Sequence, residues 1–134
     1  MKPTKKDKCP VCGMFVAKYP NFLAQIAFKD GSYAIFDGPK DMFKYYMKLP
    51  VYNASKKKED IVAVYVTDYY SLKPIDGLKA IYVAGSDVMG PMGRELVPFE
   101  KEDDATEFMA DHDGKTRLRF NEVTTDLLTR LDSF

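Results

Sequence analysis

The stretch FLAQIAFKDGSYAIF, residues 22–36, decides how the fold begins. Two short apolar runs, residues 22–28 and 33–36, flank the turn sequence Lys29-Asp30-Gly31-Ser32. An Asp-Gly turn between two such runs is a strong signal for a β-hairpin. We therefore predict two antiparallel strands joined by a tight turn over this stretch.

The residues after the hairpin predict a helix and then a third strand. Asp37-Gly38-Pro39 combines N-cap chemistry with a proline that suits the first helical turn. Pro50 and the polar run 53–58 are expected to end the helix and form an exposed loop, before a buried strand over residues 61–66. Four apolar positions fall on one stripe of this helix: Met42, Phe43, Tyr46 and Met47.

The second half of the chain repeats this order without repeating the letters. Strands are predicted over residues 79–84 and 95–99, a helix over 102–112 and a final strand over 116–122. Gly114 lies where a C′ glycine would close the helix. A short C-terminal helix carries three leucines on one stripe: Leu127, Leu128 and Leu131.

A repeated β-β-α-β order predicts an α+β protein built from two homologous ββαβ half-domains packed together. We place the first half at residues 9–70 and the second at 71–134, with the short C-terminal helix in the second. A basic tail over residues 1–8 is expected to be flexible and solvated.

Composition limits the classes of partner. The chain has 134 residues, 46% of them apolar, which is enough for one real core. Twenty acidic residues balance 20 basic ones, so bulk electrostatics favours neither nucleic acid nor a membrane surface as a partner. The sequence has no apolar run of transmembrane length and no signal peptide at its start.

The motif Cys9-Pro10-Val11-Cys12-Gly13-Met14 holds both cysteines of the chain. Thiolate and thioether sulfurs are soft donors, and a site that contains both favours Cu(I). Zinc accepts two thiolates but requires four donors. A Cys-x-x-Cys pair is also typical of a redox dithiol, and a small structural knuckle or two isolated thiols would give the same pattern.

The loop GSDVMGPMG, residues 85–93, places Met89 and Met92 among glycines and a proline. Methionine in a helix usually fills a core, but this loop has little apolar mass to bury. Both methionines are therefore candidates for a functional role. His112, the only histidine, lies on the apolar face of the predicted helix, which favours a hydrogen-bonded core histidine over a metal ligand.

These motifs together resemble the NosL-like family, the accessory lipoproteins of nitrous oxide reductase. The resemblance spans residues 9–123. Cys12-Gly13-Met14 is a weak signal alone, because YHS-type metal modules begin similarly, but its pairing with Met89-Gly90-Pro91-Met92-Gly93 is much more specific. Three other stretches match: Lys29-Asp30-Gly31, Pro98-Phe99 and His112-Asp113-Gly114.

The resemblance implies two homologous ββαβ halves and a copper chaperone, not an enzyme. Such a protein binds one Cu(I) per chain and delivers it to the tetranuclear copper centre of nitrous oxide reductase in denitrification, directly or through the assembly transporter of that enzyme. The family is periplasmic and tethered by a lipid on an N-terminal cysteine. Neither Cys9 nor Cys12 follows a lipobox-like run, so we expect a trimmed anchor or a soluble member.

For a Cu(I) carrier, two or three soft ligands at an accessible site are expected, because an incoming ligand must be able to attack the metal. We expect the two halves to share one copper, with sulfur donors from the motif at residues 9–14 and from the loop at residues 85–93. The candidate ligands, in the order of our ranking, are Cys12, Met14, Met92, Met89, His112 and Cys9.

Two other classes of function remain open. A dithiol oxidoreductase would use Cys9 and Cys12, but such a pair normally has a low-pKa thiolate at a helix N-terminus, and here it precedes the first strand. A YHS-like zinc module would need carboxylates as well, since the chain has too few cysteines and histidines to close a standard structural site.

Overall fold

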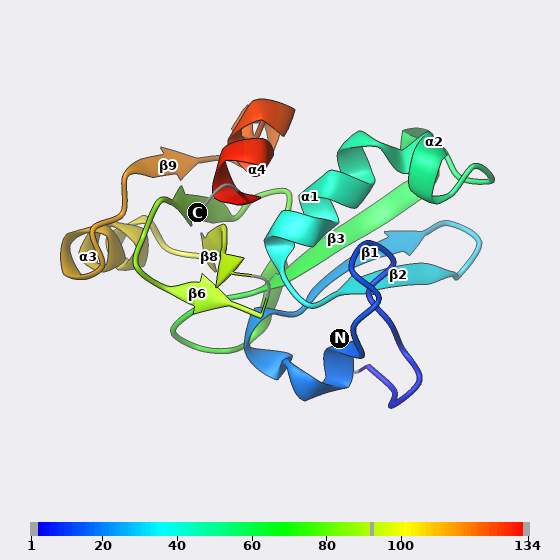
Figure 1. Cartoon of the computed structure of the whole chain (residues 1–134), viewed down its shortest axis with the longest axis horizontal. Helices are drawn as coiled ribbons and strands as arrows, with labels where there is room; N and C mark the ends of the chain where they lie inside the picture. Colours follow the sequence, from blue (N-terminus) through cyan, green and yellow to red (C-terminus); the bar gives the residue numbers. More distant parts are fainter. Residues whose placement is uncertain (1–2, 92, 133–134) are drawn as a thin grey trace.

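The predicted hairpin opens a four-stranded antiparallel sheet with the strand order β2-β1-β3-β4 (Figure 1). The structure, a computed structural model, describes residues 3–91 and 93–132. Gly31 occupies the turn of the hairpin with a φ of 89°, in the left-handed region that favours glycine. The strands of this sheet are β1 (Ala24–Phe28), β2 (Tyr33–Phe36), β3 (Ile61–Thr67) and β4 (Pro74–Asp76).

Helix α1 (Pro39–Met47) packs against β1 and β2 and carries most of the predicted apolar stripe. Met42 and Phe43 are fully buried. The third large side chain in the core is Tyr45, at 2% exposure, whereas Tyr46 is only partly buried.

Pro50 opens a helix instead of ending one, which corrects the prediction. Helix α1 has already ended at Met47, and the short helix α2 (Leu49–Tyr52) follows with Pro50 in its first turn. The first turn of a helix does not need the N–H that proline lacks, so the position suits it.

The second half forms a three-stranded antiparallel sheet with the order β8-β5-β9. In both sheets the first strand of the predicted unit lies in the centre, an arrangement compatible with two ββαβ halves. Strand β4 extends the first sheet, although it follows the expected boundary at residue 70. The α+β fold class is confirmed. The elements are β5 (Ile81–Ala84), the hairpin of β6 (Met89–Gly90) and β7 (Gly93–Arg94), β8 (Val97–Phe99), α3 (Glu102–Asp111) and β9 (Thr116–Leu118).

Two predicted ends in this half were wrong. The strand expected over residues 116–122 stops at Leu118, and a 3-10 turn follows it. Asp113, with a φ of 56°, occupies the left-handed position after α3, and the next residue, Gly114, donates its N–H to the carbonyl of Met109. Aspartate is among the few non-glycine residues that visit this region readily. The 3-10 segments of the chain are η1 (Val16–Lys18), η2 (Pro20–Phe22), η3 (Lys58–Asp60) and η4 (Phe120–Glu122).

Strand β5 joins the two halves, because its side chains enter two apolar clusters. Tyr82 and Ala84 belong to the large core shared with the first sheet, whereas Ile81 and Val83 pack in a smaller cluster with α3. The ring of Tyr82 meets that of Phe43 edge-on, with centroids 5.1 Å apart. The second half is therefore packed directly on α1.

The C-terminal helix α4 (Thr125–Asp132) forms as predicted and lies beside α1. Leu128 and Leu131 are buried in the large core, and Leu127 packs against it. Over residues 3–91 and 93–132, no helix has the length and apolar character needed to cross a membrane.

Candidate metal site

The two cysteines lie in a tight turn that precedes the first sheet. Lys8 and Phe15 form an antiparallel bridge across its base. The N–H of Cys9 donates to the carbonyl of Met14 at 2.9 Å, and the N–H of Gly13 donates to the carbonyl of Cys9 at 2.8 Å. Gly13 has a φ of 78°, a conformation that a residue with a side chain rarely adopts. The chain thus turns back on itself within six residues, with both thiols in the turn.

Asp37 and Asp41 bring two carboxylates to this turn from the start of α1. Asp37 follows β2, and Asp41 is the third residue of the helix. Both side chains are buried, at 2% and 3% exposure. One ligand atom each from Cys9, Cys12, Asp37 and Asp41 lies within 4.8 Å of the other three. We call these four residues the cysteine–aspartate cluster.

Of the two residues predicted to cap α1, Gly38 does so and Asp37 does not. The N-cap residue is Gly38, and no side chain forms a cap hydrogen bond. The carboxylate of Asp37 instead accepts a hydrogen bond from the thiol of Cys12. The Asp37 side chain, which local sequence rules predict as a helix cap, therefore belongs to the cluster instead.

Each thiol of the cluster pairs with its own carboxylate. The Sγ atom of Cys12 donates to Oδ2 of Asp37 at 3.2 Å, and Sγ of Cys9 lies 3.5 Å from Oδ2 of Asp41. Burial is the main cause that raises the pKa of both thiols, and the neighbouring carboxylates raise it further. Burial also raises the pKa of Asp37, with a further contribution from Asp41. Both cysteines are thus protonated thiols at neutral pH, and a metal must displace these protons to bind.

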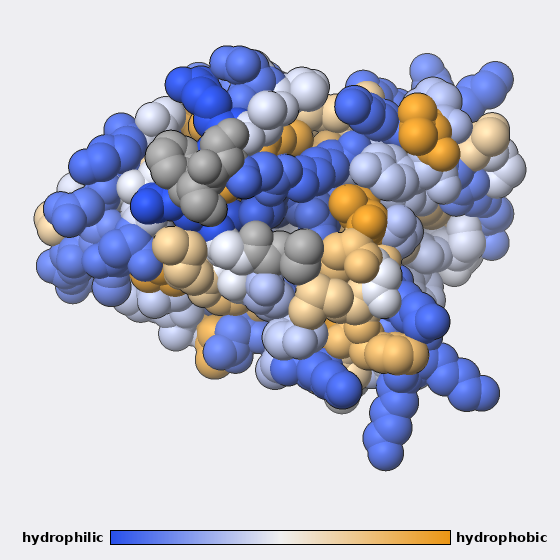
Figure 2. All heavy atoms as spheres, in the orientation of Figure 1, coloured by the Kyte–Doolittle hydropathy of each residue, from blue (hydrophilic) through white to orange (hydrophobic). Residues whose placement is uncertain are grey.

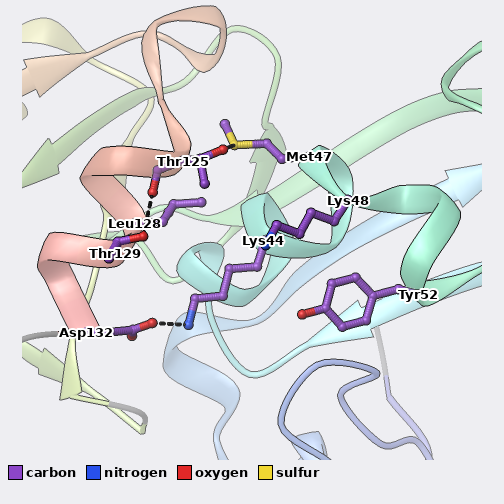
Figure 3. Close-up of a pocket in the computed structure, with 8 residues that line it drawn as sticks. All are labelled: Lys44, Met47, Lys48, Tyr52, Thr125, Leu128, Thr129 and Asp132. Atoms are coloured by element: carbon purple, nitrogen blue, oxygen red, sulfur yellow. Dashed lines mark hydrogen bonds and ion pairs between the residues drawn. The ribbon is translucent and has the colours of Figure 1, made fainter.

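Two lysines of α1 balance the negative charge beside the cluster. Lys44 Nζ lies 3.8 Å from Oδ1 of Asp41 and 2.5 Å from Oδ2 of Asp132 in α4. Figure 3 shows Lys44 reaching Asp132 along a cavity of about 170 Å³ between the two helices. Nζ of Lys40, whose side chain is buried, also contacts Asp132, at 3.2 Å. Helix α4 is therefore linked to the cluster through Lys44.

The two cysteines differ in their access to solvent. Cys9 is 1% exposed and belongs to the core, whereas Cys12 is half-buried at its edge. Figure 2 shows hydrophobic residues gathered over the N-terminal loop, with hydrophilic surface on both sides of them. A ligand from solvent or from a partner can therefore reach the cluster most easily at Cys12.

The other predicted ligands occupy varied positions. Met14 is half-buried and holds the turn through its carbonyl. Met89 is 53% exposed and lines a cavity of about 230 Å³ with residues 18–22 and Pro91. Met92 lies outside the described residues. Of the predicted ligands, the structure thus places Cys9 and Cys12 together in the cluster.

His112 forms a hydrogen bond, as its sequence context favours, but at the surface. It is the C-cap residue of α3, and its Nδ1 lies 2.8 Å from Oδ1 of Asp87. Its ring packs against that of Phe108, with centroids 4.7 Å apart. The loop at residues 85–93 is therefore tied to the end of α3 through its Asp87.

Sequence reasoning missed Asp37 and Asp41 as members of the site. Their only signal is the i, i+4 spacing of two carboxylates around a helix start, which is common without a metal. With them, the cluster offers two soft thiolates, which suit Cu(I), and two hard oxygens, which zinc also accepts. The donor set is therefore suited to a thiophilic metal ion.

Comparisons with known proteins agree with this chemistry. The NosL family model matches residues 1–128. A copper-binding lipoprotein NosL from Stutzerimonas stutzeri is 32% identical over 130 residues, and the match covers 91% of this chain but only 64% of the length of that lipoprotein.

Two solved structures share the fold. The crystal structure of the copper chaperone NosL from Shewanella denitrificans matches with a TM-score of 0.77 and 25% identity, over 94% of this chain and 96% of that one. The solution structure of apo-NosL from Achromobacter cycloclastes matches with a TM-score of 0.54 and 26% identity, over 78% of this chain and 87% of that one. The chain therefore belongs to the NosL family.

Proposed function

We propose that this chain is a non-enzymatic carrier that binds one Cu(I) through the thiolates of Cys9 and Cys12. The observation that carries the proposal is the cluster itself, in which two thiol sulfurs and two carboxylate oxygens all lie within 4.8 Å of one another. Thiolates are the donors that Cu(I) prefers among protein side chains.

The unequal burial of the two thiols suits transfer as well as binding. Cys9 is held in the core and gives a fixed donor, while the half-buried Cys12 is accessible to an incoming ligand. A receiving thiolate or imidazole can attack copper from that side, and Cys12 can then leave. The cargo is passed on by ligand exchange and is never released as a free ion.

The third ligand to Cu(I) in this proposal is a methionine sulfur or the histidine. Met14 follows Cys12 by two residues, and Met89, Met92 and His112 belong to the second half. Substitution of each methionine by leucine keeps apolar volume while removing sulfur, so a loss of copper affinity identifies a ligand. We expect the largest loss from Met14→Leu or Met92→Leu.

The proposed client is nitrous oxide reductase or its assembly transporter. The family resemblance supports this client, and two relatives are named for copper binding or copper chaperoning. The name of the Stutzerimonas stutzeri relative, a lipoprotein, supports an envelope location with a lipid anchor.

Zinc binding is the second candidate, and the carboxylates favour it specifically. Two thiolates and two carboxylate oxygens provide the four donors that a tetrahedral zinc site needs. A dithiol oxidoreductase is less well supported, because burial and neighbouring carboxylates raise the pKa of both thiols. Catalytic dithiols need the pKa of the attacking thiol to be lowered.

A competition titration separates the two metals. The fully reduced protein is titrated anaerobically with Cu(I) held by a chromophoric chelator, and separately with Zn(II) against a zinc chelator. We expect one Cu(I) per chain, bound far more tightly than zinc. Equal or tighter zinc binding would reject the carrier and favour a zinc module.

A further inference from the structure

Glu95, between β7 and β8, is buried where the second half meets the first turn of α1. Its side chain is 3% exposed. Oε1 accepts the N–H of Lys40 at 2.6 Å and that of Leu96 at 2.9 Å. The first of these bonds joins residues 55 positions apart, so the carboxylate fastens the second half to the first turn of α1.

The other carboxylate oxygen of Glu95 rests on Gly38. A Cβ atom at position 38 would lie 2.0 Å from Oε2, closer than any real contact allows. The φ of Gly38 is −171°, which any residue adopts, so the backbone angle does not require a glycine there. The close approach of Glu95 Oε2 is what favours a glycine at position 38. Gly90 of β6 also faces Oε2, since a Cβ built on it would lie 3.3 Å away.

These contacts enclose the segment that carries both carboxylates of the cluster. Gly38 adjoins Asp37, and Lys40 adjoins Asp41. A carboxylate that holds positions 38 and 40 therefore fixes how Asp37 and Asp41 are presented to the two thiols.

Position 95 carries a glutamate although burial disfavours the charged form of its side chain. Desolvation raises the pKa of Glu95 to about 8, since the backbone hydrogen bonds and the charge of Lys40 offset it only in part, while Asp41 adds to it. An apolar residue would fill the same space without a desolvation cost, so packing alone does not account for a carboxylate at this position.

We propose that Glu95 is a positioning residue for the metal site, holding the segment 37–41 so that the two aspartates face Cys9 and Cys12. This inference rests on the proposed function for its metal readout. Groups that orient the ligands of a metal commonly change its affinity by 10- to 100-fold without touching it.

The test compares Glu95→Ala with Glu95→Gln and with Val97→Ala. Glutamine keeps an oxygen that can accept the Lys40 N–H. Glu95→Gln should therefore retain most of the parent's Cu(I) affinity and most of its protection of Cys9 from alkylation. Val97 is fully buried in the smaller core cluster of the same half, so its truncation controls for a general loss of stability. Two quantities are measured for each full chain: Cu(I) affinity against a chromophoric chelator, and the rate at which iodoacetamide alkylates Cys9 in the metal-free protein.

We expect Glu95→Ala to weaken Cu(I) binding by at least about 10-fold and to speed alkylation of Cys9 by a similar factor. Glu95→Gln and Val97→Ala should stay within about 3-fold of the parent in both measurements. Glu95→Ala values equal to those of Val97→Ala would overturn the inference. If the parent binds no Cu(I), the proposed function fails, yet the alkylation rates still decide whether Glu95 positions the site.

A double-mutant cycle tests the contact with Gly38 directly. Gly38→Ala should weaken Cu(I) binding and speed alkylation about as much as Glu95→Ala, because its Cβ displaces the carboxylate. In the Glu95→Ala background the same substitution should add less than about 3-fold, since the clash is gone. Fully additive effects would show that Gly38 and Glu95 act independently, against the inference.

Discussion

The Sγ atom of Cys12 donates a 3.2 Å hydrogen bond to Oδ2 of Asp37, a residue that follows it by 25 positions. Cys9 and Asp41 form a second such pair at 3.5 Å. The two carboxylates that face the thiols come from the start of α1, so the candidate metal site depends on how the N-terminal turn packs on that helix. This arrangement predicts different roles for the aspartates with different metals.

Asp37→Asn should separate copper from zinc. The amide removes a hard ligand that zinc needs, so Zn(II) affinity should fall by more than about 100-fold. Cu(I) affinity should fall by only about 10-fold, because thiolates dominate its binding and the Asp37 carboxylate acts chiefly by orienting Cys12. Chelator competition measures both, with Asp30→Asn at an exposed ion pair with Lys56 as the control. An equally large loss for Cu(I) would make Asp37 part of the copper coordination.

Both cysteines should matter for copper. Their sulfurs lie within 4.8 Å of each other, so Cys9→Ala and Cys12→Ala should each lower Cu(I) affinity by more than about 100-fold. Alanine is preferred to serine at position 9, because a hydroxyl would be buried in the core there. Thermal unfolding of each apo variant provides the control for folding. Parent-like affinity in Cys9→Ala would leave Cys12 as the only thiolate ligand.

Glu95 should make the stability of the apo protein depend on pH. Its pKa is raised from 4.5 to about 8 in the folded protein, so the protonated form is favoured on folding. Its contribution to the free energy of unfolding is complete below about pH 4.5 and is lost as the pH rises through 8. Urea unfolding between pH 5 and 9 should therefore show a steeper fall for the parent than for Glu95→Gln. Parallel curves would mean that Glu95 does not titrate in this range.

Asp132 should stabilise the docking of α4 on α1. Its carboxylate contacts Lys44 (Figure 3). It also contacts Lys40, whose side chain is 2% exposed. Asp132→Asn should lower the free energy of unfolding by about 2 kcal/mol, less than for a fully buried pair because Asp132 is itself half-exposed.

The matched control is Asp126→Asn in the same helix. Asp126 pairs with Arg130 at 3.6 Å on the solvent side, so its loss should cost less than about 1 kcal/mol. Equal values for the two variants in urea denaturation would show that the contacts of Asp132 with the lysines add nothing.

Local patterns predicted the elements whose signals are local. The Asp30-Gly31 turn gave the first hairpin, and the leucine stripe of α4 gave its buried face. Strand β4 was missed because it has only three residues, and its pairing with β3 is set by the fold. Pro50 and Gly114 were assigned by rules that hold on average, but the chain used Pro50 to start a helix and Asp113 for the left-handed turn.

Only half of the candidate metal site could be predicted from the sequence. The Cys-x-x-Cys spacing identifies Cys9 and Cys12 as candidate ligands. No comparable pattern identifies the three carboxylates, because acidic residues near a helix start or between two strands usually face solvent. These are Asp37, Asp41 and Glu95. The burial of the two aspartates beside the thiols, and of Glu95 against the first turn of α1, depends on contacts between segments that lie 25 to 55 residues apart. No local rule describes such contacts.

X-ray absorption at the copper edge of the Cu(I)-loaded protein tests the central claim most directly. Our account predicts reduced copper of low coordination number with two or three sulfur neighbours, and the loss of one sulfur neighbour in Cys12→Ala. A coordination shell dominated by nitrogen and oxygen, unchanged in that variant, would contradict it.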